Sequence, residues 1–442
     1  MEIPEISSSL PEEMLRMIFS YLPPEDLKAV VLVCKLWSRV GQAPGLWSWV
    51  TFHAWNNEAV LEQMRLPRLQ KVSRLNITAQ NVSEELMEAV AMHPGLKKVE
   101  TYGQIFRGLK RVETECRWTN LSSVRPELLA RTFGKMEDLN LGGTKLTVDQ
   151  LNCLFASLAS GKQSSQKGKL DLSENSSLCE DGIEPSLLAA ASVRFKIVSL
   201  YNWGGASQQS WSIALFDALG SSFSCVQHLD FGGIDLSAVD TEVLTTAVSK
   251  MHFVRLRCVN LTPRQATELF TAIGEDGSKL RVLDLNANDL SSVEPSSFIP
   301  PLKFLRELHL ISTDLTTQQV EAILDGLGND SNLTDLSLNC NDISHVDPTK
   351  LVKVNHLKIV DLCVTHISIQ QLIEILRASI SGTNLNEIYW SMEEVLGWFA
   401  TIPTWNPSLE EFQKLEELMS TPMTVADSMR ALKIISQNMI AH

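Results

Sequence analysis

The chain has 442 residues, 44% of them hydrophobic and 20% charged, which is the composition of a folded protein with two to four domains or one long repeat domain. Its formal net charge of −14 argues against nucleic acid and anionic membrane as main partners, because phosphate binding needs a basic surface. No apolar run approaches the ~18 residues of a transmembrane helix, and the N-terminus lacks the basic and apolar regions of a signal peptide.

The eight cysteines are scattered along the chain and none forms a Cys-x-x-Cys pair. This usage indicates a reducing compartment, so we expect the protein in the cytoplasm or the nucleus. It also excludes a zinc-binding RING domain, which needs closely spaced ligands. The phosphate-binding loop, the serine nucleophile elbow and the His-Glu-x-x-His zinc motif are all missing. We therefore predict no catalytic residues, no metal and no cofactor.

Residues 10–47 are predicted to form three short helices. The first carries two adjacent apolar stripes at helical spacing, one with Leu15, Ile18, Phe19 and Leu22 and one with Met14, Met17 and Tyr21. Pro23 and Pro24 end it, and the second helix is expected to run from Glu25 to about Cys34, apolar nearly all round. The third carries Trp37 and ends near Gly41. So small a domain cannot bury all these faces, which indicates a partner that covers the surplus.

The spacing of this stretch resembles the F-box, at Leu10-Pro11, Glu13, Ile18-Phe19, Leu22, Asp26-Leu27, Val33-Cys34, Trp37 and Leu46-Trp47. The resemblance implies docking onto a Skp-type adaptor, which joins the protein to a cullin-RING ubiquitin ligase. It also implies that the residues that bind the adaptor or support its binding surface are Leu10, Pro11, Leu15, Ile18, Phe19, Leu22, Leu27, Val31, Val33, Cys34 and Trp37. We assign residues 8–52 to this domain and residues 53–68 to a hinge, with aromatic residues at Trp47, Trp49, Phe52 and Trp55.

From residue 69 to about 391 the chain repeats an apolar-x-x-apolar-x-apolar phrase followed by Asn or Thr, clearest from Leu280, Leu305, Leu333 and Leu357. A period in the twenties with this phrase resembles the leucine-rich repeat, here about 11–12 copies. The copies are irregular before residue 136, where strands are expected from both Leu96 and Leu109. The implied fold class is α/β: a three-helix F-box followed by a curved solenoid with a parallel sheet on its concave face and helical returns.

Capped amphipathic runs predict the helical returns: Thr147 to Leu158, Thr262 with Pro263 at the first helical position, Thr316 to Leu327, and Ser368 to Ile380. Shorter returns with proline lie between the last of these, and this alternation resembles the ribonuclease-inhibitor type of repeat. We expect residues 392–442 to form a helical cap on the last sheet edge, or one more degraded repeat.

The residues between the core positions of each strand are expected on the concave face, where they would hold a protein substrate. The candidates are Asp171, Tyr201, Asp230, Arg255, Arg257, Asp284, His309, Asp335, Asp361 and Tyr389. Acids outnumber bases there, so a partner with basic residues is one interpretation, and Arg255 with Arg257 would suit a phosphorylated motif. The alternative is that an acid after the second leucine is a structural feature of the repeat.

The resulting hypothesis is a non-catalytic substrate-recognition subunit of an SCF-type ligase, with a Skp-type adaptor and a protein substrate as partners. One alternative is a leucine-rich-repeat scaffold or inhibitor that binds partners without directing ubiquitination, which target turnover would distinguish. Another is a GTPase activator of the repeat class, which predicts activity from residues 69–442 alone.

Overall fold

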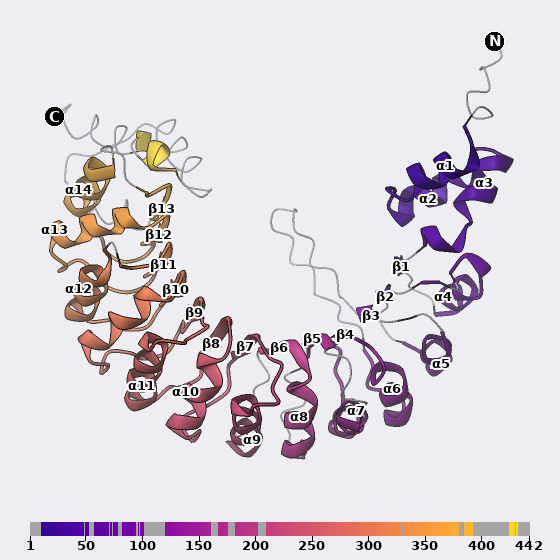
Figure 1. Cartoon of the computed structure of the whole chain (residues 1–442), viewed down its shortest axis with the longest axis horizontal. Helices are drawn as coiled ribbons and strands as arrows, with labels where there is room; N and C mark the ends of the chain where they lie inside the picture. Colours follow the sequence, from indigo (N-terminus) through magenta and orange to yellow (C-terminus); the bar gives the residue numbers. More distant parts are fainter. Residues whose placement is uncertain are drawn as a thin grey trace, which may run out of the picture. The chain divides into compact units, whose positions relative to one another are not determined.

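The computed structural model describes residues 10–47, 49–52, 57–69, 71–72, 74–77, 82–93, 96, 98–100, 120–160, 167–175, 182–201, 209–328, 330–379, 384–391, 424–428 and 430–431. The chain divides into two compact units, residues 1–211 with 223–226 and residues 212–222 with 227–442. Within each unit the strands lie on one side and the helices on the other (Figure 1).

The first unit begins with three helices, α1 (Glu12–Phe19), α2 (Pro24–Val30) and α3 (Lys35–Gly41), followed by a 3-10 turn, η2 (Pro44–Leu46). Their shared core contains Leu15, Phe19 and Leu27, all buried. Phe19 packs edge-on against Trp37, with 5.3 Å between the ring centroids. An ion pair between Glu12 and Arg39 also joins α1 to α3.

The second helix is shorter than predicted. It ends at Val30, and residues 31–33 form a turn. Cys34 is the N-cap of α3, where its Sγ accepts the backbone N–H of Trp37 at 3.5 Å. A new helix therefore starts at Cys34, and Leu32 and Val33 are exposed on the turn between the helices.

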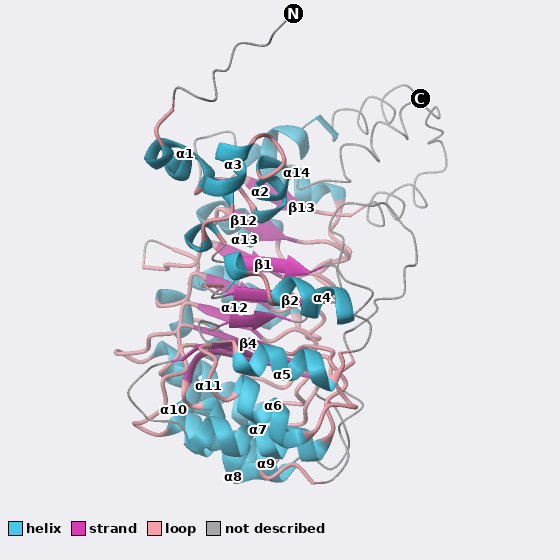
Figure 2. Ribbon diagram, turned by 90° about the vertical axis from the view of Figure 1, so that its right-hand side faces the viewer, coloured by secondary structure: helices cyan, strands magenta, loops and turns pink. Residues whose placement is uncertain are grey.

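The first unit continues with strands that each pair in parallel with the next: β1 (Trp49–Phe52), β2 (Arg74–Ile77), β3 (Lys98–Glu100), β4 (Asp138–Asn140), β5 (Lys167–Asp171) and β6 (Phe195–Tyr201). Its return helices pack one against the next: α4 (Asn57–Met64), α5 (Glu84–Met92), α6 (Pro126–Phe133), α7 (Val148–Ser160) and α8 (Pro185–Ser192). Figure 2 shows α4 to α7 stacked along the sheet.

The parallel strands begin earlier than the predicted start of the repeats at residue 69. β1 lies in the segment assigned to the end of the N-terminal domain, and α4 and the 3-10 turn η3 (Pro67–Leu69) occupy the predicted hinge. The strand expected from Leu96 is β3 and pairs directly with β4, whereas the strand expected from Leu109 lies outside the described residues. Of the aromatic hinge residues, the side chain of Trp47 alone is described.

Trp47 anchors the segment that follows the N-terminal helices. Its ring is buried, and its Nε1 donates to the carbonyl of Gly41 at 2.8 Å. The guanidinium of Arg68, on η3, lies 4.9 Å from the centroid of the Trp47 ring. One buried indole thus contacts both α3 and η3, and this contact is consistent with the expected packing of the hinge.

The second unit repeats the same strand arrangement in β7 (His228–Gly232), β8 (Phe253–Arg257), β9 (Val282–Asp284), β10 (Glu307–His309), β11 (Asp335–Ser337), β12 (Ile359–Asp361) and β13 (Glu387–Tyr389). The predicted alternation of returns is confirmed. Long helices, α9 (Gln209–Gly220), α10 (Thr241–Ser249), α11 (Pro263–Gly274), α12 (Thr317–Gly326) and α14 (Ile369–Ser379), give way after β9 and β11 to short turns, η5 (Pro295–Phe298), η6 (Pro300–Lys303), α13 (Pro348–Leu351) and η7 (Val352–His356).

Buried asparagines connect successive repeats of the second unit. The Nδ2 of Asn341 donates to the carbonyls of Leu310 and Leu338 at 2.6 and 2.9 Å. Its Oδ1 accepts the backbone N–H groups of Thr313 and Leu315. Asn288 makes the equivalent bonds one repeat pair earlier. One amide therefore satisfies backbone groups that the turning chain would otherwise bury unpaired.

A short part of the C-terminal tail lies against the last strand. Thr424 forms an antiparallel bridge with Glu387 of β13, and Val425 donates its N–H to the carbonyl of Asn386 at 3.2 Å. The Nε1 of Trp390 donates to Ser428 at 3.3 Å, and Ala431 is buried. These contacts cover part of the edge that the predicted cap would close, and the rest of the tail lies outside the described residues.

Candidate functional site

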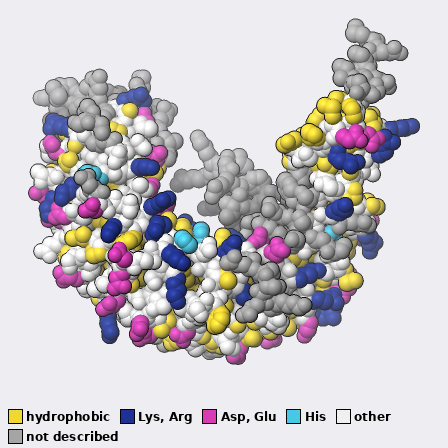
Figure 3. All heavy atoms as spheres, in the orientation of Figure 1, with side chains coloured by type: hydrophobic (Ala, Val, Ile, Leu, Met, Phe, Trp, Pro, Cys, Tyr) yellow, Lys and Arg dark blue, Asp and Glu magenta, His cyan; other side chains and the backbone are white. Residues whose placement is uncertain are grey.

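The first candidate surface is an apolar face on the N-terminal helices. Six large apolar side chains are exposed there, and we call them the N-terminal apolar face: Met14, Met17, Ile18, Tyr21, Leu32 and Val33. Tyr21 and Leu32 are each 84% exposed, and Met17 is 63% exposed. Figure 3 shows hydrophobic side chains gathered over these helices. A contiguous apolar patch of this kind marks a protein-binding surface.

The structure divides the predicted adaptor residues into a surface and its support. Pro11, Ile18 and Val33 are exposed, whereas Leu15, Phe19 and Leu27 are fully buried beneath them. The remaining five are half-buried: Leu10, Leu22, Val31, Cys34 and Trp37. A buried residue cannot touch a partner, so the buried three act by fixing the positions of α1 and α2.

Four exposed members of the face, Met14, Met17, Tyr21 and Leu32, are absent from the predicted adaptor residues. The second apolar stripe of the first helix was the signal for three of them, because Met14, Met17 and Tyr21 recur at helical spacing. Leu32 carried a weaker signal, because its exposure depends on the turn that ends α2 at Val30.

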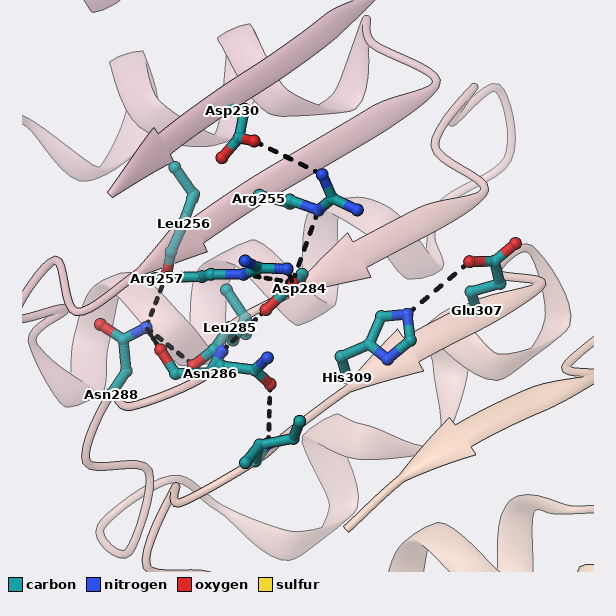
Figure 4. A network of polar contacts seen from close by, with 11 residues as sticks. Asp230, Arg255, Leu256, Arg257, Asp284, Leu285, Asn286, Asn288, Glu307 and His309 are labelled. Atoms are coloured by element: carbon teal, nitrogen blue, oxygen red, sulfur yellow. Dashed lines mark hydrogen bonds and ion pairs between the residues drawn. The ribbon is translucent and has the colours of Figure 1, made fainter. Parts of the chain in front are cut away.

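The second candidate surface is a charged cluster on the strands of the second unit, shown in Figure 4. Asp230 of β7, Arg255 and Arg257 of β8 and Asp284 of β9 come together there. Asp284 is 1% exposed, and its Oδ2 accepts from Arg257 Nε at 2.6 Å and lies 3.7 Å from Arg255 Nε. Arg255 Nη1 also donates to Asp230 Oδ2 at 3.4 Å. We call these four residues the arginine–aspartate cluster.

Aromatic rings support the same cluster from the side. The guanidinium carbon of Arg255 lies 4.6 Å from the centroid of the Phe253 ring, a cation–π arrangement. His228 stacks on the other neighbour of this ring, with centroids 5.6 Å apart and planes 13° apart. Burial lowers the pKa of His228, and the nearby His252 lowers it further, which favours the neutral imidazole. Burial raises the pKa of Asp230, against the opposing effect of Arg255 and Arg257.

The other predicted concave residues lie apart from this cluster. In the first unit, Asp171 pairs with Lys169 at 2.8 Å, and Tyr201 is exposed at the end of β6. In the second unit, His309 Nε2 lies 3.6 Å from Glu307 Oε2. Further along the sheet, Asp361 accepts from Ser337 Oγ at 3.0 Å, and Asp335 accepts from Thr334. Tyr389 donates to Glu387 at 2.9 Å, and burial together with this carboxylate raises the pKa of Tyr389 to about 12.

Three of the candidate aspartates also have a local structural role. The Oδ1 atoms of Asp171, Asp284 and Asp361 each accept the backbone N–H two residues further on, at 3.1 Å. This Asx-turn geometry fits the structural alternative for an acid after the second leucine. The acids of β7 to β9 are further matched by two arginines, so the excess of acids predicted for the whole face falls on β10 to β13.

Among the described residues, no group of three or more histidine, cysteine, aspartate or glutamate side chains is placed to hold a metal ion. Within the same residues, no helix combines the length and apolar character that crossing a membrane would require.

The comparisons with known proteins agree with the N-terminal geometry. No curated protein matches the sequence. A chain in the crystal structure of the Rad7 and Elc1 complex in yeast matches with a TM-score of 0.46 and 14% identity, over 79% of this chain and 87% of that chain. Residues 7–53 match the family model for the F-box-like domain, and this range contains α1, α2 and α3. The chain therefore carries an F-box-like domain at its N-terminus, followed by α/β repeat units with parallel strands.

Proposed function

We propose that this protein is the substrate-recognition subunit of an SCF-type cullin-RING ubiquitin ligase. The F-box-like domain binds a Skp-type adaptor, and the leucine-rich repeats bind a protein substrate. The subunit performs no covalent chemistry itself. It holds target lysines near a charged ubiquitin-conjugating enzyme, and this raises their effective concentration.

The N-terminal apolar face is the observation that carries this proposal. It lies within the segment that matches the F-box-like model, and its six residues come from α1 and from the turn between α2 and α3. Their exposure in the isolated chain has a cost in solubility, which a permanent partner would remove. An amphipathic helical partner, docking its own apolar side chains here, would bury Ile18 and Leu32 together.

Adaptor binding can be tested by exchanging one exposed methionine for lysine. Met17→Lys places a charge in the middle of the apolar face, and it should weaken the complex with a Skp-type adaptor by about 2–4 kcal/mol, a loss of 30-fold or more. The measurement is co-elution of the two purified proteins on size exclusion, followed by titration calorimetry. Co-elution of the wild-type complex with the cullin tests the next step of the assembly.

Met92→Lys is the matched control, because Met92 is also an exposed methionine on a helix, 76% exposed at the end of α5. It should leave adaptor affinity unchanged. If the wild type ignores the adaptor while remaining monodisperse, or if both variants weaken binding equally, the ligase-subunit proposal is wrong. Target turnover in cells then separates a ligase subunit from a scaffold that binds the adaptor without directing ubiquitination.

A further inference from the structure

We propose that the arginine–aspartate cluster is the part of the repeat surface that recognises an oxyanion, phosphate or carboxylate, on a side chain of the substrate. This inference extends the proposed function, since it assigns a chemical class to what the repeats hold. Arg255 and Arg257 are the residues that would contact the oxyanion, and Asp284 is a positioning residue beneath them.

The two guanidinium groups are fixed in place and remain accessible. Asp284 is 1% exposed, and it draws both arginines onto one carboxylate oxygen from below. Arg255 is also held by Asp230 and by the Phe253 ring, whereas its own side chain stays 38% exposed and that of Arg257 stays 35% exposed. Side chains that are already ordered lose little conformational entropy when a ligand binds, and this favours affinity.

Guanidinium geometry suits an oxyanion better than other ligands. Each group carries five N–H donors in a planar fork, more than the single oxygen Oδ2 of Asp284 can accept. A phosphate or carboxylate offers several acceptor oxygens and can be bound in a bidentate way. Asn286 adds a donor beside the arginines, because its Oδ1 accepts the N–H of Ile311 at 2.7 Å and its amide NH2 group is left facing the cluster (Figure 4).

The surrounding charges explain why recognition would be local. Two arginines and two aspartates give the cluster a formal charge of zero, and the chain as a whole carries −14. Long-range attraction of an anion is therefore weak, and binding would depend on hydrogen-bond geometry at short range. A phosphate has three acceptor oxygens and the larger charge, so we expect it to bind more tightly than a carboxylate.

The test uses the full chain in complex with its adaptor and three pools of fluorescent peptides with degenerate flanks. The pools differ at one central position, which is phosphoserine, glutamate or asparagine. Fluorescence anisotropy should give the tightest binding for phosphoserine, weaker binding for glutamate and the weakest for asparagine. Arg255→Lys keeps the charge but loses the fork, and it should weaken binding of the phosphoserine pool about tenfold.

Two further variants keep the result independent of folding. Removing Arg257 alone would strip a partner from the buried Asp284, so Arg257→Gln is combined with Asp284→Asn, which removes both charges together. This double variant should lose binding of the phosphoserine pool and keep the thermal midpoint near that of the wild type. Arg306→Gln is the charge control, because Arg306 is exposed just before β10 and should leave binding unchanged.

Equal binding of the three pools would overturn the proposal, and so would an equal loss in Arg306→Gln and Arg255→Lys. Equal binding of phosphoserine and glutamate above asparagine would support an oxyanion site whose ligand is a carboxylate. Adaptor co-elution is measured on every variant. Loss of peptide binding with the adaptor retained thus bears on this cluster, whereas loss of the adaptor bears on the function proposed for the whole chain.

Discussion

Single buried amides determine how one repeat is joined to the next. Asn341 is 2% exposed and bonds to carbonyls of two successive repeats. Replacing it by alanine leaves Leu310 and Leu338 carbonyls and the N–H of Leu315 buried without partners. Asn341→Ala should therefore lower the free energy of unfolding by about 3 kcal/mol. Urea denaturation followed by circular dichroism measures the change, and the exposed Asn386→Ala is the control that should have little effect.

The role of an aspartate in this repeat depends on its neighbours in the adjacent strands. Asp284 and Asp335 occupy equivalent positions in the sequence phrase, and both were predicted on the concave face. Asp284 is nevertheless buried under Arg257, whereas Asp335 is half-buried and accepts from Thr334. The phrase specifies which face a side chain occupies. Burial and pairing depend on residues about one repeat away, whose register a single sequence does not state.

At the scale of elements, glutamine at the third helical position links each long return to the preceding repeat. Gln319 of α12 completes a capping box with Thr316. Its Nε2 also donates to the carbonyls of Leu290 and Val293 at 2.8 and 2.6 Å. Gln150, Gln265 and Gln371 make equivalent bonds in their own repeats. The capping pattern was predicted from the sequence, whereas the bonds to the previous repeat depend on tertiary packing.

Gln319→Ala removes the capping interaction and leaves two or more buried carbonyls unpaired. We expect a loss of about 2–4 kcal/mol in the free energy of unfolding. The adjacent Gln318 is exposed on the same helix, so Gln318→Ala should change stability by about 0.5 kcal/mol at most. Thermal unfolding of the two variants beside the wild type measures the difference, and equal midpoints for all three would contradict the structural role of Gln319.

Elements with strong local signals were predicted well. The capped helices at Thr262 and Thr316 begin where expected, because the cap and the apolar period are both local properties. The end of α2 at Val30 and the strand at Trp49 were missed. An apolar run continues through Leu32 and Val33, so its period gives no stop signal, and β1 is a strand by virtue of pairing with β2.

At the scale of the whole molecule, the sequence predicted the order of the parts: an F-box-like domain and then parallel-strand repeats. The N-terminal match is local and rests on many positions, so it was recognisable in about a tenth of the chain. The arginine–aspartate cluster required the structure, because its members come from three strands and are separated by up to 54 positions in sequence, from Asp230 to Asp284.

The proposed mechanism requires both binding surfaces on the same chain, since a receptor works by holding two partners at once. Immobilised adaptor should therefore retain the fluorescent phosphoserine peptides through the wild type. Neither Met17→Lys, which loses the adaptor, nor the Arg257→Gln, Asp284→Asn double variant, which loses the peptides, should retain them. A mixture of the two variants should also fail, because no single chain in it carries both surfaces.

Retention by the mixture at the wild-type level would contradict this expectation and would indicate that chains associate with one another. A mixture of Met92→Lys with Arg306→Gln is the matched control, and it should retain peptide as well as the wild type does, because each of its chains keeps both surfaces. Failure of that control would mean that the substitutions act through folding. The comparison thus separates a bridging receptor from a chain whose two surfaces act independently.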